Sequence, residues 1–144
     1  NRSLASGVAL AEELSRVAGR SGRRPDVIAP VPLHGWRFFR RGYNQADVLA
    51  RRLGRDLEVR VDAGLLQRCR RTAAQSGLDA AQRRRNVRGA FRVARRRRAP
   101  VPPCVALIDD VMTTGATLEA CTRALLQAGA RSVLLWIVAR APPP

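Results

Sequence analysis

The chain contains no lysine. All 27 of its basic residues are arginines, and they face only 11 acidic residues, which gives a formal net charge of +16 at pH 7. So complete a preference for arginine indicates a compositional bias toward arginine codons, and this weakens the charge as a sign of any one function. The charge still attracts polyanions such as nucleic acid, nucleotides and pyrophosphate.

Cysteine and histidine are also scarce. Cys69, Cys104 and Cys121 form no Cys-x-x-Cys pair, and His34 is the only histidine, so a zinc site within this chain is not expected. Three scattered cysteines favour a reducing, cytoplasmic location over a disulfide framework. No apolar run has the length of a membrane span, and the first residues do not resemble a signal peptide.

The length of 144 residues and the hydrophobic content of 46% predict one globular domain, over 1–141, with 142–144 as a proline tail. Apolar periodicity predicts helices over 4–18, 44–57, 78–87 and 117–128, and strands over 26–31, 65–68, 90–94, 105–108 and 132–138. This alternation predicts an α/β fold with a mostly parallel sheet and helices on both faces. Ligands of such folds bind beyond the carboxyl ends of the strands.

The densest motif is VALIDDVMTTGATL, at residues 105–118. An apolar strand ends in two carboxylates, and a turn with a glycine and hydroxyl side chains then opens a helix. Backbone N–H groups of such a turn and of the helix N-terminus bind phosphate, while the carboxylates suit ribose hydroxyls or Mg²⁺. The alternative is an ordinary strand-to-helix turn with Asp and Thr as caps, but capping explains one polar residue and not two acids with three threonines.

The motif resembles the phosphoribosyl pyrophosphate (PRPP) motif of type I phosphoribosyltransferases. Three further segments extend the resemblance: PVPLH at 30–34, RRGYNQA at 40–46, and a middle segment with Arg68, Thr72, Gln75, Arg83, Asn86 and Phe91. Together they resemble the ComF family of competence-related, GntX-type proteins over almost the whole chain. The resemblance implies a type I phosphoribosyltransferase-like fold with a small hood or flexible loop.

The resemblance also implies roles for particular residues. Asp109 and Asp110 would be the catalytic pair, holding the ribose hydroxyls directly or through Mg²⁺, and would be the metal ligands. The 5′-phosphate would be bound by Val111, Met112, Thr113, Thr114, Gly115, Ala116 and Thr117. Pyrophosphate would be bound by Pro32, Leu33, Arg41, Asn44 and Gln45. The flexible loop, closing over the diphosphate with Arg70 and Arg71, would contain Arg68, Thr72, Gln75, Arg83 and Asn86.

Several of these residues have a structural alternative. Asn44 is expected to cap the following helix whichever function holds, and the arginines around residue 70 could form a solvated basic loop. His34 could act as a general base, although a lone histidine beside a loop is more often structural.

Two departures from the family patterns bear on function. The N-terminal four-cysteine zinc module common in the ComF family is absent from this chain, and so is the loop lysine that many phosphoribosyltransferases use. The sequence therefore supports two hypotheses. The first is a phosphoribosyltransferase that uses PRPP and Mg²⁺ with a nitrogenous acceptor. The second is a non-enzymatic nucleotide- or single-stranded-DNA-binding protein of the same fold, associated with DNA uptake. The sequence leaves open which base is the acceptor. It also leaves open the oligomeric state, for which a homodimer is one alternative.

Overall fold

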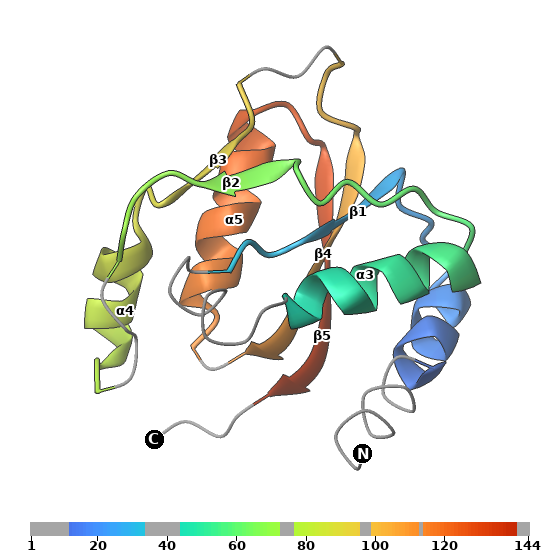
Figure 1. Cartoon of the computed structure of the whole chain (residues 1–144), viewed down its shortest axis with the longest axis horizontal. Helices are drawn as coiled ribbons and strands as arrows, with labels where there is room; N and C mark the ends of the chain where they lie inside the picture. The colour runs from blue at the N-terminus through green and yellow to red at the C-terminus, as the bar shows by residue number, and fades with distance from the viewer. Residues whose placement is uncertain (1–11, 34–43, 73–76, 96–98, 113, 141–144) are drawn as a thin grey trace.

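Three parallel strands at the centre of the fold carry the motif identified above (Figure 1). The computed structural model describes residues 12–33, 44–72, 77–95, 99–112 and 114–140. After a helix that includes residues 12–20, the elements are β1 (Val27–Pro30), α3 (Gln45–Asp56), β2 (Leu66–Arg68), α4 (Ala80–Val87), β3 (Phe91–Val93), β4 (Cys104–Met112), α5 (Ala116–Gln127) and β5 (Ser132–Arg140).

The parallel sheet has the order β1–β4–β5. Val27 pairs with Val105 and Pro30 with Ile108, while β5 pairs with β4 from Cys104 to Met112. Residues 105–108 are fully buried in the central strand, as their continuous apolar character predicts.

The β4 strand is longer than predicted. The sequence placed its end at Ile108, but pairing with β5 extends it to Met112, so that Asp109 and Asp110 lie within the strand and not in the turn. The cause is a partner strand: β5 continues to Arg140 and supplies ladder hydrogen bonds along the polar end of β4.

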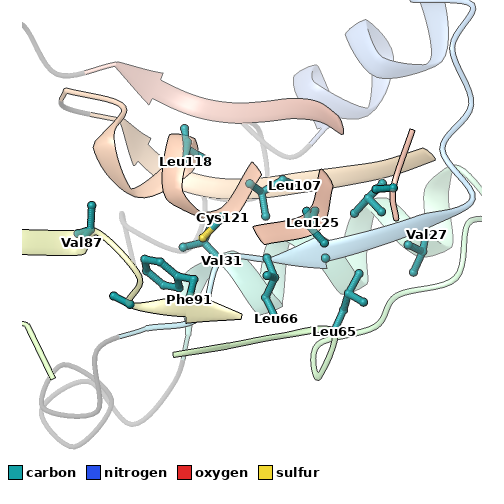
Figure 2. Close-up of a cluster of buried hydrophobic side chains, with 14 of the residues drawn as sticks. Val27, Val31, Leu65, Leu66, Val87, Phe91, Leu107, Leu118, Cys121 and Leu125 are labelled. Atoms are coloured by element: carbon teal, nitrogen blue, oxygen red, sulfur yellow. The ribbon is translucent and has the colours of Figure 1, made fainter. Parts of the chain in front are cut away.

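The two faces of the sheet bury two separate apolar clusters. On one face α5 contributes Leu118, Cys121 and Leu125 to a cluster with β1, β4 and the β2–β3 region (Figure 2). On the other face α3 contributes Ala46, Ala50 and Leu53, which pack with Ile28, Ala106, Ile108 and Trp136. Because side chains alternate along a strand, β4 gives Leu107 to the first cluster and Ile108 to the second.

Strands β2 and β3 do not join the parallel sheet. They form a separate antiparallel pair, with Leu66 opposite Val93 and Arg68 opposite Phe91. Both strands were predicted, but their position outside the parallel sheet was not. Burial of Leu66 and Phe91 in the α5 cluster holds this pair over one face of the sheet, where it forms the hood (Figure 1).

Helix α4 connects the two hood strands and is fixed at both ends. At its start Asp79 and Gln82 form a capping box, with reciprocal side-chain bonds of 2.7 and 2.9 Å. Near its end Arg70 donates to the carbonyl oxygens of Asn86 and Arg88, at 2.8 and 2.7 Å. Val87 is the only buried residue of this helix.

Helix α3 approaches the chain beside β1 closely. A Cβ atom on Gly54 would lie 2.5 Å from Val61 Cγ2 and 2.8 Å from the Val59 carbonyl oxygen. Val61 in turn forms a parallel bridge with Ile28 of β1. Glycine at position 54 is therefore required by space. Within the described ranges, no helix combines the length and apolarity needed to cross a membrane.

Candidate functional site

The turn that follows β1 begins beside the part of β4 that carries the two aspartates. The Val31 N–H donates to the Ile108 carbonyl oxygen at 2.9 Å, immediately beyond the pairing of Pro30 with Ile108. The half-buried Pro32 and Leu33 therefore begin their turn alongside the two aspartates of β4. Two segments that the sequence assigned to pyrophosphate and to ribose 5-phosphate thus share one edge of the sheet, as expected for carboxyl ends of parallel strands.

The two aspartates belong to opposite faces of β4. Asp109 shares the face of Leu107, toward α5, and Asp110 shares the face of Ile108, toward α3. Each carboxylate accepts a hydrogen bond from the next backbone N–H: Asp109 Oδ1 from Asp110 at 2.9 Å, and Asp110 Oδ1 from Val111 at 2.8 Å. Both residues are partly exposed, so their carboxylates are accessible to a ligand from two sides of the strand end.

The turn before α5 has the form of an anion site. Gly115 precedes the helix with φ of 78°, in the left-handed region that glycine adopts without strain, and it has no side chain to cap the helix. Thr114 Oγ1 accepts from the Ala116 N–H at 3.4 Å, and the partly buried Thr117 follows in the first turn. The first N–H groups of a helix have no intrahelical partners and attract anions.

Other residues predicted to bind phosphate differ in placement. Val111 is 47% exposed at the end of β4, and Met112 packs with the α5 cluster. Ala116 is buried at the start of α5, and its N–H donates to Thr114 Oγ1. Thr113 lies outside the described residues.

Asn44 caps α3, as the sequence predicts. Its Oδ1 accepts from the Ala46 N–H at 3.1 Å, while its Nδ2 donates to the Val31 carbonyl oxygen at 3.1 Å. The side chain therefore holds the start of α3 against the end of β1. Gln45 is the first residue of that helix, and Arg41 lies outside the described residues.

Arg68 lies on strand β2 of the hood and packs on Phe91 of β3. Its guanidinium lies 5.0 Å from the centre of the Phe91 ring and donates to the hydroxyl of the buried Thr72. Burial raises the pKa of the Cys121 thiol, Asp109 raises it further, and Arg68 opposes the rise. Arg68 and Asp109 therefore both exert their charge on the Cys121 thiol.

The predicted flexible loop is largely regular structure. Arg68 belongs to strand β2, and Arg83 and Asn86 belong to helix α4, in agreement with the strand predicted over 65–68 and the helix predicted over 78–87. Their assignment to a loop that closes over the ligand stays a prediction. Gln75 lies outside the described residues. Arg70, expected to close over a diphosphate, instead caps the end of α4. That role depends on a contact across 16 residues or more, which no local pattern in the sequence indicates.

Within the described part of the chain, no three His, Cys, Asp or Glu side chains group closely enough to hold a metal ion. The carboxylate oxygens of Asp109 and Asp110 are nevertheless ligands of the kind that Mg²⁺ takes, usually with waters and substrate phosphates as the remaining ligands. The donor set at this strand end therefore fits Mg²⁺ bound together with a phosphorylated ligand.

Comparison with solved structures defines the class of the fold. The chain aligns with the allosteric regulatory enzyme of purine biosynthesis at a TM-score of 0.58 and 20% identity, over 92% of this chain and 26% of that one. It aligns with adenine phosphoribosyltransferase from Leishmania donovani at a TM-score of 0.53 and 17% identity, over 90% of this chain and 50% of that one. The chain therefore has the phosphoribosyltransferase fold, as predicted.

Sequence comparison then identifies the relatives within that class. The chain is 41% identical to competence protein F of Haemophilus influenzae over 117 residues, which are 81% of this chain and 51% of that protein. It is 40% identical to DNA utilization protein YhgH of Escherichia coli K12 over the same share of the chain, which is 50% of that protein. No family model matches the chain. The chain is thus a ComF-type protein, and it spans about half the length of these relatives.

Proposed function

We propose that the chain binds PRPP together with Mg²⁺ and transfers the phosphoribosyl group to or from a nitrogenous acceptor. The observation that carries this proposal is the hydrogen bond between Val31 and Ile108, which sets the turn after β1 beside the aspartates of β4. A ligand with a diphosphate, a ribose and a 5′-phosphate needs three neighbouring binding regions, and this edge of the sheet offers them in that order.

Each region has a distinct task in the proposed reaction. The turn at Pro32 and Leu33 receives the pyrophosphate. The carboxylates of Asp109 and Asp110 accept hydrogen bonds from the ribose hydroxyls, and their charge favours the positive ribosyl centre that develops as pyrophosphate leaves. The backbone around Gly115 and the first turn of α5 hold the 5′-phosphate, which fixes the position of the ribose.

Mg²⁺, when bound, neutralises charge on the leaving pyrophosphate. The residues of the chain that would hold it are Asp109 and Asp110, directly or through water. Arg68 stabilises negative charge from the hood side, since its guanidinium charge, like that of Asp109, acts on the Cys121 thiol between the hood and the sheet. The hood over the α5 face also helps to exclude water from the developing ribosyl cation.

The second candidate function is DNA handling without phosphoribosyl transfer. It is favoured by the names of the relatives, competence protein F and DNA utilization protein, and by the net charge of +16. A site of this kind would bind a nucleotide or single-stranded DNA on the same fold. Binding would weaken steeply with salt, because displaced counterions dominate the affinity of nucleic acid for basic proteins.

Calorimetric titration with PRPP, in Mg²⁺ and in EDTA, tests the first candidate. We expect saturable binding that requires Mg²⁺ and that weakens about tenfold or more in Asp110→Asn, the usual effect of removing a charged hydrogen-bond partner. The control is Glu58→Gln, which removes one exposed negative charge in the turn after α3 and should leave the affinity unchanged.

Titration of the same variants with a thymidine oligonucleotide separates the two candidates. If PRPP does not bind, and the oligonucleotide binds Asp110→Asn as tightly as the unaltered chain, the phosphoribosyl proposal is wrong and the DNA candidate holds. If PRPP binds and turnover follows on addition of a nitrogenous base, the enzymatic candidate holds.

A further inference from the structure

A groove of about 270 Å³ runs between helices α4 and α5. Its lining begins at Ala116, directly after the candidate phosphate turn, and continues along α5 away from that turn. On α5 it follows one stripe from Ala116 to Gln127, so by helical rise it is about 17 Å long. Figure 1 shows the two helices side by side, with α4 at the outer edge of the molecule. An elongated groove of this length fits an extended or helical segment better than a compact ligand.

The floor of the groove is apolar and is formed largely by small side chains. Ala116, Ala120 and Ala124 succeed one another at every turn of α5, and the buried Val87 of α4 and Phe91 of β3 lie beneath them. Ala120 and Ala124 are the partly exposed members of this floor. Alanines at this spacing let the backbone of a second helix approach closely, so that its aliphatic side chains fill the spaces between them. The floor therefore favours an occupant with one apolar face.

The rim of the groove is basic. Arg84, Arg85 and Arg88 line it from α4, and Arg123 lines it from α5. The single acid, Glu119, is already engaged at 3.0 Å by Arg123 and at 3.8 Å by Arg84. With Arg84 and Arg123 side chains 64% and 58% exposed, the rim presents positive charge to the solvent and complements carboxylates.

These features distinguish among occupants. A nucleic-acid strand would use aromatic faces for stacking, but Phe91 is only 6% exposed and Arg68 lies over its ring. A second copy of this chain would bring a net charge of +16 toward a basic rim. We propose that the α4–α5 groove binds an amphipathic helix of a partner protein, with aliphatic residues on one face and carboxylates on its flanks.

This mode of recognition seats the apolar face of a helix in a groove and reads the flanks by charge. It uses neither the aspartates of β4 nor the turn after β1, and it meets the candidate phosphate site only at Ala116. Helix α4 has eight residues and buries only Val87, so a helix bound in the groove would cover more of the α4 surface.

The test uses a fluorescein-labelled synthetic peptide of about 18 residues, long enough to populate a helix on its own. Leucines occupy one face and glutamates flank it, and a scrambled peptide of the same composition has the same charge. We expect the amphipathic peptide to bind the chain about tenfold more tightly than the scrambled one, as measured by fluorescence anisotropy. Equal affinity would mean that charge alone attracts the peptide, which would overturn the proposal.

Matched variants locate the binding. Ala120→Trp fills the groove and should weaken the amphipathic peptide about tenfold, while Arg85→Glu should weaken it several times more than Arg55→Glu does. The two arginine variants change the net charge equally, but Arg55 lies on α3, over the opposite face of the sheet. If Ala120→Trp does not fold, the comparison of Arg85→Glu with Arg55→Glu decides by itself; equal affinities there would overturn the proposal.

Two further results would overturn the choice of occupant. A thymidine oligonucleotide that binds more tightly than the peptide, and that loses affinity in Arg85→Glu but not in Arg55→Glu, would assign the groove to nucleic acid. Dimerisation in sedimentation experiments that Ala120→Trp abolishes would assign it to a second copy of the chain.

Discussion

The Asn44 side chain connects the first turn of α3 to Val31, the residue that follows β1. Its amide nitrogen donates to the Val31 carbonyl oxygen and its amide oxygen accepts from the Ala46 N–H, both at 3.1 Å. Val31 itself donates to Ile108 at the end of the buried part of β4. A short chain of hydrogen bonds therefore connects the start of α3, through Val31, to the strand that carries the two aspartates.

Replacing Asn44 should destabilise the fold at this junction. Asn44→Ala removes both the helix cap and the bond to Val31, and we expect the free energy of unfolding to fall by about 1–2 kcal/mol in urea denaturation. Asn44→Asp keeps an oxygen for the cap but loses the donor, so its loss should be smaller. Equal stability of the three proteins would contradict this account.

At Gly54, helix propensity and packing predict opposite effects of a substitution on stability. In an ordinary helix interior, Gly→Ala stabilises by about 1 kcal/mol. Here a Cβ atom would clash with Val61 and with the Val59 carbonyl oxygen, so Gly54→Ala should instead destabilise by about 1–3 kcal/mol. The control is Gly19→Ala, in the helix that includes residues 12–20, where the nearest atom is 3.8 Å away. Thermal unfolding that leaves both variants at least as stable as the original would refute the close approach.

Gly115 separates a backbone requirement from a ligand requirement. Gly115→Ala and Gly89→Ala both place a side chain at a positive φ, of 78° and 65°, so each should lose about 1–2 kcal/mol of stability. Neither added Cβ meets an atom closer than 3.6 Å, so the cost is conformational in both. Only Gly115 precedes α5 at the candidate phosphate turn. PRPP affinity should therefore fall in Gly115→Ala alone, and an equal fall in Gly89→Ala would contradict the assigned site.

The cysteines should differ sharply in reactivity. Burial and Asp109 raise the pKa of the Cys121 thiol above its ordinary value, so at pH 8 this residue has almost no thiolate, the form that reacts with iodoacetamide. Cys69 is exposed. Mass spectrometry after brief alkylation of the native chain should find label on Cys69 and none on Cys121, and alkylation in denaturant should label both. Rapid native labelling of Cys121 would mean that α5 separates from the sheet.

The elements that were predicted correctly depend on local patterns. The apolar runs of β4 and β5 mark strands, and the spacing of Ala46, Ala50 and Leu53 marks the buried side of α3. The run of β5 also predicts a buried strand, which is wrong: only Trp136 is buried in it, because β5 is an edge strand of the parallel sheet. The Asn44 cap was also predictable, because it acts on a residue two positions away. The motif at 105–118 identified the fold class, since its spacing fixes one strand, one turn and one helix together.

What the sequence did not predict depends on partners distant along the chain. The predicted end of β4 lies too early because Asp109 and Asp110 interrupt its apolar run, and the ladder with β5 keeps them and the next two residues in the sheet. The antiparallel pairing of β2 with β3 and the cap that Arg70 gives to α4 are contacts of the same kind. The resemblance singles out Arg68, but nothing in the sequence predicts that its guanidinium lies over the Phe91 ring of β3.

The pairing of β1 with β4 has a consequence for the order of events in folding. Asp26 accepts a hydrogen bond from the Cys104 N–H across 78 residues, at the point where the two strands begin to pair. Closing so long a loop costs conformational entropy before the strands form any stabilising contact. Folding from the unfolded chain is therefore slow. During synthesis the turn after β1 leaves the ribosome early, but its partner β4 follows only much later. The edge where this turn lies beside the aspartates of β4 therefore forms only when most of the chain has left the ribosome.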